Sequence, residues 1–153
     1  MLLPFLVTSI LARTKPDGNP IFRQTTTEIV IPSFAASSQI ILEISPTNPT
    51  WMLLLYRLQF GDTPINTFDL EILQAGSLIR TGQLTSDDID TGIDTMVMLR
   101  QATPLRLEIT NLDPLIAHPF RCTQSFVVVD NQDDWNKFQA YLNQVLLPGG
   151  VGA

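Results

Sequence analysis

Residues that could carry out nucleophilic catalysis are few, because the chain has one histidine, His118, and one cysteine, Cys122. Nucleophilic catalysis needs a serine or cysteine beside a base, together with a third group that orients the base. No serine or cysteine is placed around His118 as in a nucleophile elbow, and a single loop histidine is more typical of a turn or cap. In an extended strand Cys122 lies on the same face as Phe120 and Phe126, which is typical of a small buried side chain. We therefore expect no catalytic residues, no cofactor and no enzymatic activity.

One acidic run, SDDIDTGID, offers the densest group of oxygen ligands, and calcium is an ion that binds such oxygens. Its aspartates at alternating positions are Asp88, Asp90 and Asp94. The run differs from an EF-hand because its glycine is the fifth residue from Asp88, whereas the EF-hand glycine is the sixth. Alternatively, Thr85 or Ser86 caps a short helical turn whose acidic residues complement the helix dipole. The sequence thus predicts no metal site, and these three aspartates are the ligands to test for calcium.

The charge balance argues against a nucleic-acid partner. Lys and Arg total 9 and Asp and Glu total 15, which gives a net charge of −6, whereas phosphate binding draws on clustered positive charge. Charged residues make up only 16% of the chain and the mean hydropathy is +0.17. Because this composition is apolar for a solitary monomer, we expect a partner to cover part of the surface.

Residues 2–12, LLPFLVTSILA, form an apolar run with two interpretations. The run is shorter than the ~20 residues of a membrane-spanning helix, and no basic residue precedes it as in a secretory signal peptide. It is either a buried strand of the domain's own sheet, or an arm that adds a strand to, or packs against, a neighbouring subunit. In the second case the interface residues are Leu2, Leu3, Phe5, Leu6, Val7, Ile10 and Leu11.

Residues 27–130 show the alternation of apolar and polar side chains that is typical of antiparallel strands, with turn residues at short intervals. In 104–111 every second residue from Leu105 to Ile109 is apolar. In 51–60 the even-numbered residues form an unbroken apolar row on one face, and the first odd-numbered residues are apolar as well. This segment is expected to be a central strand covered on both faces at one end. Seven or eight such strands predict two sheets packed face to face.

One helix is expected at 132–147. Either Asp130 or Asn131 can cap it, and its apolar residues fall on one stripe. The stripe consists of Trp135, Phe138, Leu142, Val145 and Leu146. The predicted fold class is therefore all-β: an antiparallel β-sandwich, jelly-roll-like, closed by one C-terminal α-helix.

The length of 153 residues predicts one domain. Residues 1–20 are expected to form an N-terminal apolar arm and linker, and residues 21–130 the β-sandwich. The helix at 131–147 packs on the sandwich or beside it, and residues 148–153, PGGVGA, form a flexible tail.

At the level of the whole profile, the chain resembles accessory proteins of tailed-phage virions, such as capsid decoration (cement) proteins and head or tail fibre modules. The features that carry this resemblance are the apolar arm Leu2–Ala12, the strands from Glu28 to Asp130 and the glycine-rich tail Pro148–Ala153. The resemblance implies a homo-oligomer, a trimer or a dimer, whose subunits lie over capsid junctions and stabilise the shell.

We accordingly expect a non-enzymatic structural assembly protein located in a virion. Its expected partners are copies of itself and a larger protein assembly such as a capsid, with no nucleic acid and no membrane span. The alternative is an extracellular carbohydrate-binding or adhesion module on the same β-sandwich, with calcium as a possible ligand of its loops.

Overall fold

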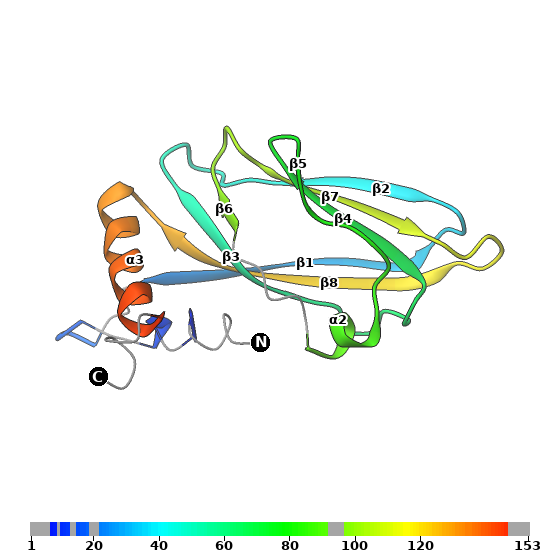
Figure 1. Cartoon of the computed structure of the whole chain (residues 1–153), viewed down its shortest axis with the longest axis horizontal. Coiled ribbons are helices and arrows are strands. Elements are labelled where there is room, and N and C mark those ends of the chain that lie inside the picture. The colour runs from blue at the N-terminus through cyan, green and yellow to red at the C-terminus, as the bar shows by residue number, and fades with distance from the viewer. Residues whose placement is uncertain (1–6, 9, 13–14, 19–21, 92–96, 147–153) are drawn as a thin grey trace.

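The computed structural model shows two four-stranded antiparallel sheets packed face to face, with a helix at one end (Figure 1). It describes all residues except 1–6, 9, 13–14, 19–21, 92–96 and 147–153. The strands are β1 (Arg23–Phe34), β2 (Gln39–Ile44), β3 (Met52–Gln59), β4 (Phe68–Gln74), β5 (Ser77–Arg80), β6 (Val97–Leu99), β7 (Leu105–Asn111) and β8 (His118–Val129). The helices are α2 (Ser86–Thr91) and α3 (Gln132–Leu146). The prediction of a β-sandwich with one C-terminal helix is confirmed.

The strand order is that of a jelly roll. One sheet has the order β1–β8–β3–β6 and the other the order β2–β7–β4–β5. The first strand pairs with the last, the second with the seventh, the third with the sixth and the fourth with the fifth. Such a chain is a long antiparallel hairpin folded over on itself, which is how eight strands form a two-sheet jelly roll.

Alternate side chains of both sheets fill the space between them. The alternation predicted for 104–111 is confirmed, because Leu105, Leu107 and Ile109 are all buried there. Phe68 lies at the centre of an aromatic group, with its ring centroid 5.2 Å from that of Phe34 and 5.0 Å from that of Phe120. Edge-to-face packing of this kind adds to the free energy gained from burial alone.

β3 is the central strand buried on both faces, as predicted, but a β-bulge changes its alternation. Leu55 and Arg57 pair with consecutive residues of β8, so Tyr56 is an extra residue in the register. A bulge shifts the side chains that follow it to the other face of the sheet. The expectation that the even-numbered residues of 51–60 share one face is therefore wrong. Met52, Leu54 and Tyr56 face the helix α3, whereas Leu58 and Phe60 face the other sheet.

α3 packs on the outer face of the β1–β8–β3–β6 sheet, near the start of β1 (Figure 1). Asn131 is its N-cap, because the Asn131 Oδ1 accepts a hydrogen bond of 2.9 Å from the Asp134 backbone N–H. Asp130, the other predicted cap, forms an ion pair with Arg23 instead. Of the predicted apolar stripe, Trp135, Phe138 and Leu142 pack in this second core, and the side chains of Val145 and Leu146 lie outside the described part.

The described part of the N-terminal run is helical at residues 7, 8, 10 and 11, so the expected strand is wrong there. Val7, Ile10 and Leu11 have the spacing of one helix face, and they pack in the second core beside α3 and Phe22. This packing explains the difference, because a short apolar run fits a helix or a strand equally well until its neighbours decide. The predicted tail at 148–153 lies outside the described residues.

Candidate functional site

A network of hydrogen bonds holds the loop between β7 and β8. The His118 Nε2 lies 2.9 Å from the Asp113 Oδ2, and the Asp113 Oδ1 accepts bonds from the backbone N–H groups of Leu115 (2.9 Å) and Ile116 (3.1 Å). The hydrogen bond from His118 and those from the two backbone N–H groups lower the pKa of Asp113 from its ordinary value. His118 thus braces a loop, in agreement with the turn or capping role predicted for it.

Asn111 anchors the same loop to the rest of the sandwich, and its side chain is 1% exposed. Its Nδ2 donates hydrogen bonds to the carbonyl oxygens of Phe34 (3.0 Å) and Ile116 (3.2 Å). Its Oδ1 accepts a hydrogen bond of 2.9 Å from the Asp113 backbone N–H. Sequence reasoning missed Asn111, because its partner Phe34 is 77 residues away and nothing local indicates the contact.

The braced loop presents apolar side chains to solvent. Leu115 is 86% exposed, Ile116 57% and Leu112 46%. We call these three residues the β7–β8 tip; their loop lies at the end of the sandwich farthest from α3 (Figure 1). A single exposed leucine is ordinary, but a fixed apolar group at the end of a molecule is typical of an interaction surface.

A groove of about 900 Å³ opens at the other end, between β1 and the segment that joins β2 to β3. A second hollow of about 320 Å³ continues this groove between β1 and β2. The two hollows share the lining residues Thr27, Ile44 and Ser45. Together they form what we call the β1–β2 groove. Its floor is the side of the inter-sheet core, formed by Leu53, Phe126 and Val128. Its rim carries hydroxyl groups, from Thr8, Thr25, Thr27, Ser45 and Thr47.

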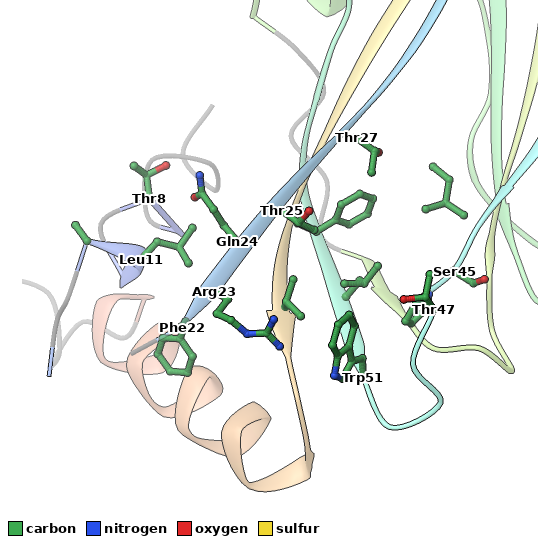
Figure 2. Close-up of a pocket in the computed structure, with 16 residues that line it drawn as sticks. Thr8, Leu11, Phe22, Arg23, Gln24, Thr25, Thr27, Ser45, Thr47 and Trp51 are labelled. Atoms are coloured by element: carbon green, nitrogen blue, oxygen red, sulfur yellow. The ribbon is translucent and has the colours of Figure 1, made fainter. Parts of the chain in front are cut away.

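Arg23 and Trp51 close the α3 end of the groove. Figure 2 shows Arg23 pointing from the start of β1 toward Trp51, and the guanidinium carbon lies 5.0 Å from the centre of the ring. This cation–π contact covers one face of the indole, while the ring packs against the inter-sheet core. The ion pair with Asp130 neutralises the same guanidinium. Trp51 and Tyr56 belong to different cores, which confirms that they do not form one aromatic platform.

Cys122 is buried in the inter-sheet core with Phe120 and Phe126, as the alternation predicted. Burial raises the pKa of its thiol to about 12. Because the thiolate is the reactive form, this thiol is inert in the folded protein.

The acidic run has a structural use. The Asp88 Oδ2 accepts hydrogen bonds from the Thr85 backbone N–H (2.9 Å) and the Arg80 Nη2 (3.1 Å), as in one half of a capping box at the start of α2. Within the described ranges, no three His, Cys, Asp or Glu side chains gather to hold a metal ion. Asp94 and the side chain of Asp90 lie outside those ranges.

The predicted N-terminal interface is only partly described. Leu2, Leu3, Phe5 and Leu6 lie outside the described residues. Val7 and Ile10 are fully buried by their own chain, and Leu11 is partly exposed and lines the β1–β2 groove. Val7 and Ile10 therefore stabilise their own subunit in this structure, and the interface around them stays a prediction.

No protein-family model and no curated protein matches the chain. Among solved structures it is similar to a subunit of the disulfide-linked pili of Bacillus endospore appendages, with 11% identity over 78% of this chain and 97% of that one, and a TM-score of 0.38. It is also similar to the VP2 subviral particle of infectious bursal disease virus, with 17% identity, 70% and 32% coverage, and a TM-score of 0.33. A third match is dimeric latent PorU of Porphyromonas gingivalis, with 12% identity, 71% and 13% coverage, and a TM-score of 0.35.

This chain thus spans about a third of the viral protein and less than a sixth of PorU. All three TM-scores lie below 0.5. None of the described helices has the length and hydropathy needed to cross a membrane.

Proposed function

We propose that this chain is a non-enzymatic structural assembly protein, which acts by burying apolar surface against copies of itself and against a larger protein assembly. The observation that carries the proposal is the β7–β8 tip, where Leu115 and Ile116 stand exposed on a loop fixed by Asn111, Asp113 and His118. The loop is already ordered, so binding through it loses little conformational entropy.

The free energy available at the tip is large for so few residues. Complete burial of a leucine or isoleucine side chain stabilises a complex by about 1.5–3 kcal/mol each. Interfaces commonly depend on a few such residues surrounded by contacts that exclude water. The tip is therefore suited to be the centre of an interface rather than its rim.

The more specific form of the proposal is a virion component, such as a capsid decoration or cement protein that stabilises a shell through contacts between subunits, as a trimer or dimer. It follows from the resemblance of the sequence profile and from the jelly-roll body with its exposed apolar end. Electron microscopy of particles with and without the protein tests it: decoration predicts density over subunit junctions, and particles that never bind the protein would contradict this form.

The test of the assembly role is the double variant Leu115→Ser/Ile116→Ser, with Leu78→Ser as its control. Leu78 is also exposed, at 55%, but lies on β5 away from the tip. We expect light scattering to show association by the wild type and the control, and a loss of about tenfold or more in the double variant. A wild-type chain that stays monomeric and binds no larger assembly would rule the proposal out.

Glycan binding, the alternative function, has less support from the described residues. One face of Trp51 is covered by Arg23, and Asp88 is engaged by Thr85 and Arg80. Retention of the chain on a glycan surface, or a rise of its melting temperature with calcium, would favour this alternative.

A further inference from the structure

The β7–β8 tip and the β1–β2 groove lie at opposite ends of the sandwich. β1 begins beside the groove at Arg23 and ends at Phe34. The carbonyl oxygen of Phe34 accepts a hydrogen bond from Asn111, which anchors the loop of the tip. A strand of 12 residues spans roughly 36 Å at the ordinary rise per residue. The tip of one chain therefore cannot reach the groove of the same chain, whereas a second copy can present its tip there.

The two surfaces match in shape and polarity. The tip is a narrow apolar projection, and the groove is a recess whose floor is apolar and whose volume of about 900 Å³ is large enough for several side chains. In the described sheets β1 pairs only with β8 and β2 only with β7, so both walls of the groove have backbone N–H and C=O groups free to bond an incoming segment. The hydroxyl groups of Thr25, Ser45 and Thr47 also line the groove and are suited to hydrogen-bond the backbone of the loop.

The charges beside both surfaces also permit close contact. Asp113 is paired with His118 next to the tip, and Arg23 is paired with Asp130 next to the groove. A charge buried beside its hydrogen-bonded partner costs less free energy than a charge buried alone. Glu28 and Glu43 line the second hollow, so we expect the tip to occupy the first hollow, whose lining residues carry no carboxylate.

We infer that the β1–β2 groove of one copy binds the β7–β8 tip of a second copy, so that subunits join head to tail. The inference rests on the proposed function and adds which surface binds which. Since two different surfaces meet, each contact leaves one groove and one tip free, and subunits continue to add until a ring closes or a filament grows.

Two variants separate the halves of this contact. Leu115→Asp places a charge on the tip and leaves the groove intact. Thr25→Trp fills the groove from the exposed edge strand β1 and leaves the tip intact. The matched controls are Leu78→Asp, at an exposed site on β5, and Thr26→Trp, whose side chain projects from the opposite face of β1 because strand residues alternate.

The decisive experiment mixes the two variants and measures mass by analytical ultracentrifugation. We expect each variant alone to associate about tenfold or more weakly than the wild type, and the controls to match the wild type. We expect the equimolar mixture to form a 1:1 dimer that does not grow, because one intact groove meets one intact tip.

Three outcomes would overturn the inference. A mixture that stays monomeric shows that tip and groove do not bind each other. Loss of association in Leu115→Asp but not in Thr25→Trp shows that the tip binds elsewhere, and the proposed assembly role then stands without this contact. A wild-type chain that does not self-associate removes the head-to-tail contact, whereas binding of that monomer to a larger assembly still supports the assembly role.

Discussion

Asn111 is the residue on which the geometry of the β7–β8 tip depends most. Its side-chain amide donates hydrogen bonds to the carbonyl oxygens of Phe34 in β1 and Ile116 in the tip. Its side-chain carbonyl oxygen accepts a hydrogen bond from the Asp113 backbone N–H. The sequence identified His118 as a loop residue and Cys122 as a buried one from their immediate neighbours. Asn111 could not be found in this way, because its role arises from a contact with Phe34 that only the folded sandwich creates.

The variant Asn111→Ala tests this role. Removing the amide leaves buried backbone groups without their partner, so we expect the free energy of unfolding to fall by about 2 kcal/mol. Urea denaturation measures the change, and Asn143→Ala, at an exposed position of α3, is the control. Equal stability of Asn111→Ala and the wild type would show that the network is dispensable.

The burial of the Cys122 thiol predicts how the free energy of unfolding depends on pH. Its thiol has a pKa of about 12 in the folded chain and about 8.5 in an unfolded one, so above pH 8.5 only the unfolded state loses this proton. We expect the free energy of unfolding to be constant below pH 8.5 and to fall as pH rises, by at most about 1.4 kcal/mol per pH unit. Tyr56, whose pKa is raised by burial, adds to this fall only above its ordinary value of 10.

Denaturation curves at pH 7 to 10 measure the effect, with Cys122→Ala as the control. The variant should lose the decline between pH 8.5 and 10. Rapid reaction of the native thiol with iodoacetamide at pH 8 would contradict the burial on which this prediction rests.

Among the elements, the strands were predicted from alternation because most of them have one face on the core and one in solvent. The exception is β3, where the bulge at Tyr56 moves Leu58 and Phe60 to the other face. A bulge depends on pairing with β8, so the residues of β3 alone do not show it. The N-terminal run differs for a similar reason: its helical form depends on the neighbouring helix α3.

The cap of α3 offers a test at this scale. Asn131→Ala removes the acceptor for the Asp134 N–H, so we expect a loss of about 1 kcal/mol in the free energy of unfolding. Asn131→Asp keeps an acceptor at the same position and should match the wild type. Thermal or urea denaturation compares the three chains, and an equal loss in both variants would contradict the capping role.

For the whole molecule, the sequence predicted the class of fold, which is confirmed, and apolar side chains on the surface, which the structure also shows. The sequence placed the expected interface in the N-terminal run between Leu2 and Leu11, and it indicated neither the β1–β2 groove nor the β7–β8 tip. The β1–β2 groove lies between two sheets, and the β7–β8 tip is held in place by contacts with the end of β1 and by the hydrogen bond between His118 and Asp113. Both surfaces are products of the jelly-roll topology, which sets strands distant in sequence side by side.

The pairing of the first strand with the last has a consequence for synthesis of the protein. Arg23 and its partner Asp130 are 107 residues apart, so β1 leaves the ribosome long before β8 exists to bind it. Topologies dominated by such distant contacts fold slowly and expose unpaired strands meanwhile. The threonine-rich first half of β1 suits this interval, because a polar nascent strand adheres less readily to its neighbours on a polysome than an apolar one would.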